Sequence, residues 1–427
     1  MELNLIDVEF LIRSCVFKQT AQIVEYLLQQ LADRADEQYQ PPPGFKFKGR
    51  QTIQINSIFG PCELTRGYYY NEPRKQGLHP ADAYLGLEAS NTPALARLIC
   101  NEGADETSFE KAQRHLDETG GIQVSARQIQ RLIQQVGEDA QQFQTRNDPP
   151  ETASEKVPIL YVSADGTGVP MRKEEVAGRS GKQEDGGAKT RQAYLGCVFT
   201  QHRCNEQGHP ERDHESTTYV SAFGTSSDFG ITLRSEALRR GLGRAKETVL
   251  LIDGATGLEK MGRDSFPKCT QIVDYYHATE HANEVVTALL GSKDHPEHDK
   301  KFSHWKEGLL DDRVEELIKE SRAECPPANR EVLETKLTYF VNNVKRMQYG
   351  TFRAKGYFIG SGVIEAGCKT VIGQRCKQSG MFWSLDGAQK ILALRSIQYS
   401  RYTDIFWQRR KQKKIVEIQR PAFKNAA

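Results

Sequence analysis

The spacing of apolar residues changes along the chain and divides it into segments with different predicted structures. Residues 4–38 carry apolar side chains at every third or fourth position, which predicts a helix, and Pro41–Pro43 ends that segment. Residues 52–70 alternate apolar and polar positions around a Gly-Pro turn, the pattern of a β-hairpin. Helical spacing returns from Pro93 to Gln144. We therefore expect residues 1–144 to form a mainly helical N-terminal region that contains a β-hairpin.

Two helical stretches of this region, residues 107–116 and 125–137, have the proportions of a helix-turn-helix. Thr119–Gly121 forms the turn, and Ser125 is expected to cap the second helix. In such a motif the start of the second helix contacts base edges, so the predicted base contacts are Arg127, Gln128 and Arg131. An ordinary helical hairpin explains the same pattern and is the more frequent structure, because no residue of the turn is diagnostic.

The remainder of the chain predicts an α/β domain. Residues 145–158 are polar, contain prolines and lack periodicity, so we expect a linker there. Five strands follow, with a helix between the third and fourth and a short helical piece before the fifth. The strands are expected at 159–169, 193–201, 217–225, 247–255 and 270–277. From Ala278 to about Met347 only helical spacing occurs, and residues 360–378 form a further helix.

This order of elements is that of a ribonuclease-H-like fold, in which helices cover both faces of a mixed sheet. We expect the domain to span residues 159–407 and a basic tail to follow at 408–427.

The charge is distributed unevenly. The net charge is only +2, but from Ala366 onward there are 13 Lys and Arg against 3 Asp and Glu, a local charge of +10 that leaves −8 for the rest. A basic C-terminal segment on a nearly neutral protein indicates a surface that faces a polyanion. A solvated basic face explains the same composition.

The nine cysteines contain no CxxC pair, which is typical of reduced thiols in a cytosolic protein. The N-terminus lacks the apolar core of a signal peptide, and no apolar run approaches the ~18 residues of a membrane helix. We expect a soluble cytoplasmic protein with no membrane partner.

Two of the predicted strands end alike, in Ala-Asp165-Gly and Ile-Asp253-Gly. In the ribonuclease-H-like order the first and fourth strands are neighbours, so both carboxylates would project at one end of the sheet, where α/β ligand sites form. Two anions ~4 Å apart repel by about 4 kcal/mol at an effective dielectric near 20, unless they are protonated, paired with a base or bridged by a cation. Oxygen ligands alone favour Mg²⁺. The alternative for Asp165 is turn chemistry, with Gly166 letting the chain leave the sheet.

Glu365 is the best candidate for a third carboxylate. It lies about one turn into the helix that Gly360–Gly362 opens, although an acidic residue near a helix N-terminus is also favoured by the dipole alone, by ~0.3–1 kcal/mol. Three carboxylates can hold two Mg²⁺ ions, with Mn²⁺ as a substitute, and such a pair promotes in-line displacement at a phosphodiester. The predicted catalytic and metal-binding residues are Asp165, Asp253 and Glu365.

Five strings of the sequence together resemble the Kra-type insertion-sequence transposases, which are DDE enzymes of bacterial mobile elements distantly related to Mutator-like transposases. The strings are "SADGTGVPM", "GRSGKQEDGGAKTRQAYLGCVFTQ", "STTYV", "DYYHATEH" and "GSGVIEAGCKTVIGQRCKQSGMFWS". The resemblance covers about residues 158–407, with a weaker similarity over 50–140. It implies that Asp165, Asp253 and Glu365 form the DDE triad, and that residues of about 280–350 are the all-helical insertion before the final glutamate.

The resemblance also places residues beside the active site. Asp274 and His277 match an Asp-x-x-His signature of related transposases, and His281 lies four residues further on the same helical face. That spacing permits a zinc pair, but a phosphate contact or a structural hydrogen bond is preferred because no third ligand is evident. The chain departs from the family at Asn71 and Arg74, where members often have a CxxC knuckle. We therefore expect no zinc.

Further residues are predicted to contact DNA. Residues of the glycine-rich loop at 172–191 would contact the DNA backbone near Asp165, and residues around the Glu365 helix would contact DNA phosphates. An aromatic residue after that helix would stack on an unpaired base, although core packing is the commoner use of tryptophan. These residues are Arg179, Lys182, Lys369, Arg375, Lys377 and Trp383.

Together these features predict a DNA transposase of a bacterial insertion sequence. It would cleave strands at terminal inverted repeats with Mg²⁺, transfer the 3′-hydroxyl into target DNA, associate with the nucleoid, and form at least a dimer when it brings two ends together. The alternatives are a ribonuclease-H-like nuclease without integration, and an inactive or domesticated copy that only binds DNA.

Overall fold

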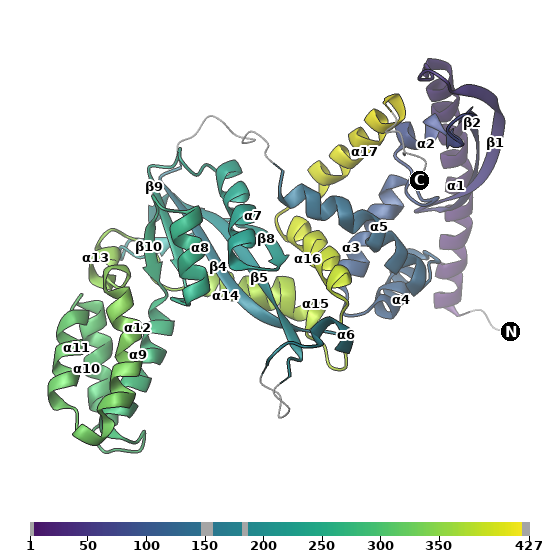
Figure 1. Ribbon diagram of the computed structural model, residues 1–427. Coiled ribbons are helices and arrows are strands. Elements are labelled where there is room, and N and C mark those ends of the chain that lie inside the picture. Colours follow the sequence, from purple (N-terminus) through teal and green to yellow (C-terminus); the bar gives the residue numbers. More distant parts are fainter. Residues whose placement is uncertain (1–3, 147–156, 182–186, 421–427) are drawn as a thin grey trace. The chain divides into compact units, whose positions relative to one another are not determined.

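The computed structural model describes residues 4–146, 157–181 and 187–420. The chain forms two units (Figure 1): unit 1 comprises Met1–Phe143 together with Arg401–Ala427, and unit 2 comprises Gln144–Ser400. None of the helices in the described ranges is long and apolar enough to cross a membrane.

Unit 1 combines a long helix with a small antiparallel sheet and a group of shorter helices. Its elements are α1 (Leu5–Gln38), β1 (Lys46–Ser57), β2 (Gly60–Asn71), β3 (Gln76–Leu78), α2 (Pro80–Leu85), α3 (Pro93–Asp105), α4 (Phe109–Gly120), α5 (Ala126–Gln144) and α17 (Thr403–Gln419). The predicted β-hairpin is confirmed as β1 and β2, and β3 adds a third antiparallel strand. Small residues let α1 lie close to this sheet, because Ala21 and Ala32 pack against the buried Ile55 and Leu64.

The two helical stretches at 107–116 and 125–137 form α4 and α5. α4 ends at Gly121, whose φ of 64° is left-handed and therefore favours glycine. The predicted cap at Ser125 is confirmed: its hydroxyl accepts the Gln128 N–H at 3.2 Å, and Gln128 Oε1 accepts the Ser125 N–H at 2.8 Å. This reciprocal pair is a capping box.

The basic segment at the C-terminal end of the sequence is helical as far as Gln419 and belongs to unit 1. Arg410 is buried and donates two hydrogen bonds to Glu88, at 2.7 and 2.9 Å, and it also pairs with Asp139. Lys413 pairs with Asp139 and Lys414 with Glu88. These basic side chains therefore neutralise acidic residues of their own unit.

Unit 2 is built on a mixed five-stranded sheet in the order β10-β9-β4-β5-β8. Its strands are β4 (Ile159–Pro170), β5 (Thr190–Gln201), β8 (Thr218–Phe223), β9 (Glu247–Ile252) and β10 (Thr270–Val273). β5 runs antiparallel to β4 and β8, whereas β9 runs parallel to β4 and β10. The predicted pairing of the first and fourth strands is found. Between β5 and β8 the chain forms a small hairpin of β6 (Arg203–Cys204) and β7 (Pro210–Glu211).

The expectation that Gly166 turns the chain away from the sheet is wrong. β4 continues through Asp165 to Pro170, and Gly166 lies opposite Tyr194 of β5. A β-carbon at Gly166 would collide with the Gln192 side chain from β5. The glycine therefore makes room for a neighbour across the sheet rather than for a turn.

Helices cover both faces of this sheet. They are α7 (Ser226–Arg239), α8 (Thr256–Ser265), α14 (Gly362–Gly367) and α16 (Leu385–Tyr399), with the short α6 (Lys173–Val176) near the end of β4. Gly196 of β5 lies under Leu233 of α7, whereas the adjacent Leu195 lies beneath Gly367 of α14. Because successive strand residues point to opposite faces, α7 and α14 lie on opposite sides of the sheet.

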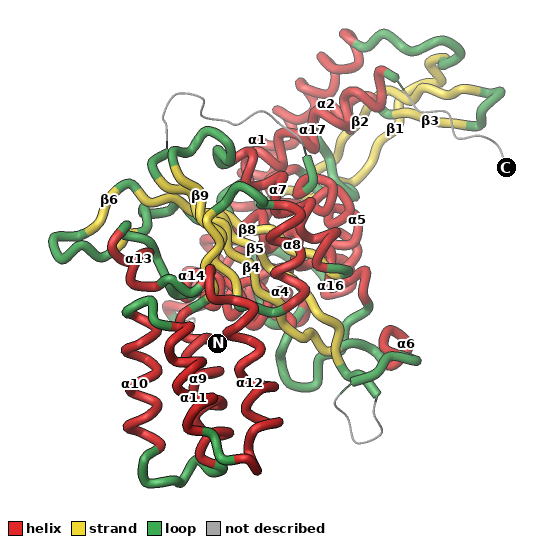
Figure 2. Tube along the Cα trace, turned by 60° about the vertical axis from the view of Figure 1, so that its left-hand side comes forward, coloured by secondary structure: helices red, strands yellow, loops and turns green. Residues whose placement is uncertain are grey.

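A helical segment separates the last strand from α14. Figure 2 shows its longer helices side by side as a bundle. Its members are α9 (Tyr275–Leu290), α10 (His298–Leu310), α11 (Val314–Glu324), α12 (Arg330–Asn343) and α13 (Tyr349–Ala354), with short 3₁₀ turns at Pro327–Asn329 and Val344–Arg346. After it, α14 continues into a π-helical turn, Cys368–Gly373, and then α15 (Gln374–Cys376). Turns of this kind are frequent at functional sites.

Candidate active site at the ends of the central strands

Asp165 and Asp253 occupy corresponding positions on neighbouring strands. Ala164 pairs with Ile252 in the parallel register of β4 and β9; Asp165 continues β4, and Asp253 directly follows the last residue of β9. Asp165 Oδ1 accepts the Gly166 N–H at 2.6 Å, and Asp253 Oδ1 accepts the Ala255 N–H at 3.0 Å. Burial is the largest effect on Asp253 and raises its pKa. The hydrogen bond from Ala255 lowers this pKa and the charge of Asp165 raises it, and the result is a pKa above the ordinary value. The charge of Asp165 thus adds to burial in disfavouring the charged form of Asp253.

Glu365 reaches this edge of the sheet through a hydroxyl bridge. Its Oε1 accepts the Ser361 hydroxyl at 2.6 Å, and the same hydroxyl is hydrogen-bonded to Asp274 Oδ2. The Ser361 N–H also donates to Asp274 Oδ2, at 2.9 Å. Because one hydroxyl carries one proton, it serves only one of the two carboxylates at a time.

The π-helical turn brings the other end of this helix against Asp165. Burial raises the pKa of the Cys368 thiol well above its ordinary value, and the charge of Asp165 and a hydrogen bond to Asp165 add to this effect. Two residues along β4, Thr167 is hydrogen-bonded to the ammonium group of Lys377. Residues from β4, β9 and the helix of Glu365 therefore surround one part of the sheet edge.

Asp274 has a structural function in this arrangement. It is fully buried and caps α9, since its Oδ1 accepts the N–H groups of Tyr276, at 2.6 Å, and His277, at 3.3 Å. Its other oxygen holds Ser361. One carboxylate therefore fixes the beginnings of both α9 and the helix of Glu365.

The two histidines of α9 each pair with a glutamate three residues further along, His277 with Glu280 and His281 with Glu284, both at 3.5 Å. Burial is the largest effect on His281 and lowers its pKa. The two interpretations given for this pair, a phosphate contact and a structural hydrogen bond, both stay predictions.

Tyr339 of α12 is a neighbour of the site that the sequence did not indicate. Its ring lies over Gly254, where a β-carbon would come within 2.9 Å of it, and stacks on His281 with the ring centres 3.8 Å apart. Burial, followed by the charges of Asp253 and Asp274, raises its pKa. Its buried hydroxyl has no hydrogen-bond partner among the described residues. No local pattern could have identified it, because it comes from the helical segment; Ser361, in contrast, lies inside the conspicuous Gly-Ser-Gly.

Two residues predicted to contact DNA are buried, and this corrects their placement. Arg375 is 1% exposed and lies 4.8 Å from the centre of the Trp383 ring. Trp383 is 8% exposed and is held by backbone hydrogen bonds to Pro170 and Arg172. The guanidinium and the indole ring stabilise each other in the interior, so core packing accounts for the tryptophan.

The other predicted DNA contacts lie at the surface of their own units, except for one position outside the described residues. Arg127, Gln128 and Arg131 are exposed at the start of α5, where Gln128 also takes part in the capping box. Arg179, Lys369 and Lys377 are exposed in unit 2, and Lys182 lies outside the described residues.

A hydrogen bond joins Asn71 and Arg74, the two positions at which the sequence lacks the cysteines of a CxxC. Asn71 is 2% exposed, and its Oδ1 accepts the Arg74 N–H at 3.2 Å. The end of the hairpin is therefore held by a side-chain amide where a knuckle would use thiolates.

The chemistry of the site fits a divalent cation. No ion pair among the described residues neutralises Asp165, Asp253 or Glu365, and the charge of Asp165 disfavours the ionised form of Asp253. The ligand atoms of Asp165, Asp253 and Glu365 do not all lie within 4.8 Å of one another. Among the described residues, the ligand atoms of Glu102, Glu106 and His115 of unit 1 do lie that close together. In that group His115 pairs with Glu102 at 2.7 Å and Lys111 with Glu106 at 3.2 Å, so ion pairs account for it.

Comparison with known proteins gives few relatives. No curated protein matches the chain. Among solved structures, a Drosophila P element transposase in its strand transfer complex aligns with 9% identity over 73% of this chain and 92% of that chain, at a TM-score of 0.34. NurA with manganese aligns with 16% identity over 67% and 66%, at a TM-score of 0.11. Scores this low do not establish a common fold. The model of an uncharacterised protein family, UPF0236, matches residues 2–183.

Proposed function

We propose that the protein is a DNA transposase, that unit 2 is its catalytic domain with a ribonuclease-H-like fold, and that Asp165, Asp253 and Glu365 are its catalytic carboxylates. The observation that carries the proposal is the register of β4 and β9, which puts an aspartate next in line on each of two adjacent parallel strands. Strand order, two covered faces and a helical segment ahead of Glu365 support the fold. The resemblance to the Kra type supports the choice of transposition among phosphodiester reactions.

Two Mg²⁺ ions would be held by the three carboxylates. When bound, such ions stabilise the negative charge on the attacking and leaving oxygens of a phosphodiester. The chain itself contributes the three carboxylates, which it holds in place by backbone N–H groups and by Ser361. Lys377, beside Thr167 on β4, supplies a positive charge for a DNA phosphate.

DNA is the proposed partner, and binding of the element's ends is assigned to unit 1. Arg127 and Arg131 are exposed on the first turns of α5, where the second helix of a helix-turn-helix contacts base edges. Arg179 and Lys369 would contact the backbone near the carboxylates. Base contacts would change sequence preference, whereas phosphate contacts would weaken binding to all sequences.

The proposal is tested with purified protein and oligonucleotides that carry the inverted repeats bordering this reading frame. With Mg²⁺, the wild-type protein should nick the repeat end and join the new 3′-hydroxyl to a second duplex. Asp253→Asn and Glu365→Gln should abolish both products, whereas the control Asp299→Asn, at a fully exposed position, should retain them. Full activity of Asp253→Asn would refute the assigned mechanism.

Two other outcomes identify the alternatives. Nicks without joined products would indicate a nuclease that does not integrate. A gel shift that depends neither on Mg²⁺ nor on Glu365, with no cleavage, would indicate a copy that only binds DNA, an outcome to which Asn71 and Arg74 give specific support.

A further inference from the structure

Helix α1 exposes an unusual amount of apolar surface. More than half of the surface of each of ten large apolar side chains on this one helix is exposed. They are Leu5, Ile6, Phe10, Leu11, Ile12, Val16, Ile23, Tyr26, Leu27 and Leu31. Scattered exposed apolar residues are normal, but a contiguous set on one element indicates an interaction surface.

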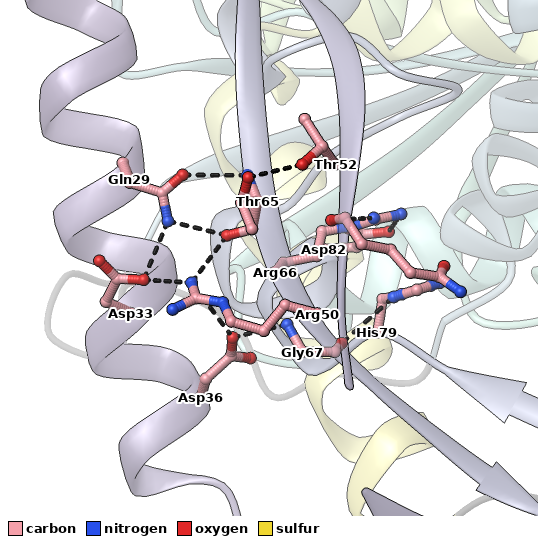
Figure 3. Close-up of polar contacts among 11 residues, drawn as sticks. Gln29, Asp33, Asp36, Arg50, Thr52, Thr65, Arg66, Gly67, His79 and Asp82 are labelled. Atoms are coloured by element: carbon pink, nitrogen blue, oxygen red, sulfur yellow. Dashed lines mark hydrogen bonds and ion pairs between the residues drawn. The ribbon is translucent and has the colours of Figure 1, made fainter. Parts of the chain in front are cut away.

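The opposite side of α1 is already occupied, which fixes the rotation of the helix about its axis. Figure 3 shows its polar contacts with the sheet. Gln29 accepts the Thr65 N–H at 2.9 Å and donates to the Thr65 carbonyl at 2.8 Å, and Asp36 accepts the Gly67 N–H at 2.6 Å. Together with the buried alanines of the same side, these contacts orient the exposed residues other than Phe10 and Leu11 away from the sheet.

The exposed residues include one straight stripe. Leu5, Ile12, Val16, Ile23 and Leu27 are separated by seven, four, seven and four positions. At about 100° per residue, all five fall within an arc of about 60°, opposite the alanines that pack on the sheet. Spacings of seven and four make an eleven-residue repeat, about 3.67 residues per turn, which keeps an apolar line nearly straight along a helix and pairs helices in a right-handed coiled coil.

We propose that α1 pairs with α1 of a second copy of this chain. The 34 residues give a contact line of about 50 Å. At roughly 80 Å² of exposed area for each of the eight side chains on the stripe's half of the helix, which are all but Phe10 and Leu11, the surface amounts to about 640 Å² per copy and about 1,300 Å² for the pair, at the lower end of the range for a stable interface. A second copy presents the same stripe, so a two-fold axis satisfies both helices at once.

Charge selects the direction of the pair. Glu9 lies inside the stripe and Arg34 continues it beyond Leu27, and in a parallel pair each of them would face its own copy. An antiparallel pair with Ile12 opposite Ile23 instead places Glu9 opposite Tyr26, whose hydroxyl can donate to the carboxylate. The proposal concerns unit 1 alone and does not depend on the function proposed for unit 2.

The mass of the full-length protein in solution, measured by sedimentation without DNA, tests the proposal. The wild-type chain should sediment at about twice the 48.2 kDa of one copy. The double variant Ile12→Glu/Ile23→Glu should sediment as a monomer at the same concentration, with an unchanged circular dichroism spectrum. A matched control, Ile231→Glu/Val332→Glu, changes two equally exposed residues of unit 2 and should remain dimeric.

A monomeric wild-type protein, or a double variant that dimerises as well as the wild type, would overturn the proposal. Cross-linking then tests the direction in a Cys15→Ser background. Ile12→Cys combined with Ile23→Cys should form an intermolecular disulfide, and Ile12→Cys alone should not. Efficient cross-linking of the single variant would overturn the antiparallel arrangement.

Discussion

Replacing Asp253 by asparagine should stabilise unit 2 while removing its response to magnesium. Asparagine keeps an oxygen that can accept the Ala255 N–H but carries no charge beside Asp165. Neighbouring strands are about 4.8 Å apart, and two unit charges at about 5 Å repel by about 3 kcal/mol at an effective dielectric of 20, or by about 1 kcal/mol in water. Because both carboxylates are partly exposed, we expect a gain near the lower value, about 1 kcal/mol.

Thermal unfolding with and without EDTA measures both effects. In EDTA the variant should unfold about 2–4 °C above the wild type, the shift that 1 kcal/mol produces in a domain of this size. Mg²⁺ at ten times its dissociation constant should stabilise the wild type by about 1.4 kcal/mol and the variant by much less. The control Asp299→Asn should behave as the wild type in both conditions. A variant that is destabilised in EDTA, or that responds to Mg²⁺ as strongly as the wild type, would refute the idea that this carboxylate pair is a cation site.

Three further predictions concern the same contacts and those of unit 1. The raised pKa of Asp253 means that its protonated form is favoured in the folded state. Its contribution to stability is therefore present at low pH and is lost as the pH rises through the folded-state pKa. In EDTA, denaturant titrations of the wild type should show this loss of stability, and those of Asp253→Asn should not. Tyr339→Phe removes a buried hydroxyl without a described partner and should leave stability unchanged or raise it by up to about 1 kcal/mol, as measured by urea unfolding; a loss above about 1 kcal/mol would show that the hydroxyl is hydrogen-bonded. Arg410→Met leaves the buried Glu88 paired with Lys414 alone and should lower the free energy of unfolding of unit 1 by about 3 kcal/mol. The control Lys411→Met, on the exposed side of the same helix, should lower it by at most about 0.5 kcal/mol. Equal effects of the two substitutions would contradict the buried pair.

The sequence indicates the pairing of Asp165 and Asp253 because both follow apolar runs in an order of elements that has few solutions. The apolar pattern predicts a strand at 159–169 that runs past Asp165, whereas Asp-Gly is typical of turns, and the local sequence does not decide between the two. The deciding neighbour, Gln192, comes from another strand, and cross-strand packing leaves no mark on the local pattern.

Burial was predictable for apolar residues but not for the pair of Arg375 and Trp383. Arg375 lies in a polar stretch and looks exposed when taken alone, whereas core packing is the commoner use of a tryptophan such as Trp383. Together the charge and the ring stabilise each other in the interior, a contact that depends on where α15 meets the segment that follows it. Tyr339 escaped prediction for the same reason, because the helix that carries it is brought over Gly254 only by the fold.

The two segments of unit 1 are synthesised far apart in time. α17 leaves the ribosome only after all of unit 2 has been made, yet it carries the buried partner of Glu88 and Asp139. Unit 2 can therefore fold while unit 1 still has two acidic groups without their guanidinium. A chain stopped after Ser400 would keep every strand of the large sheet and all three candidate carboxylates, but its N-terminal unit would have to fold without its last helix.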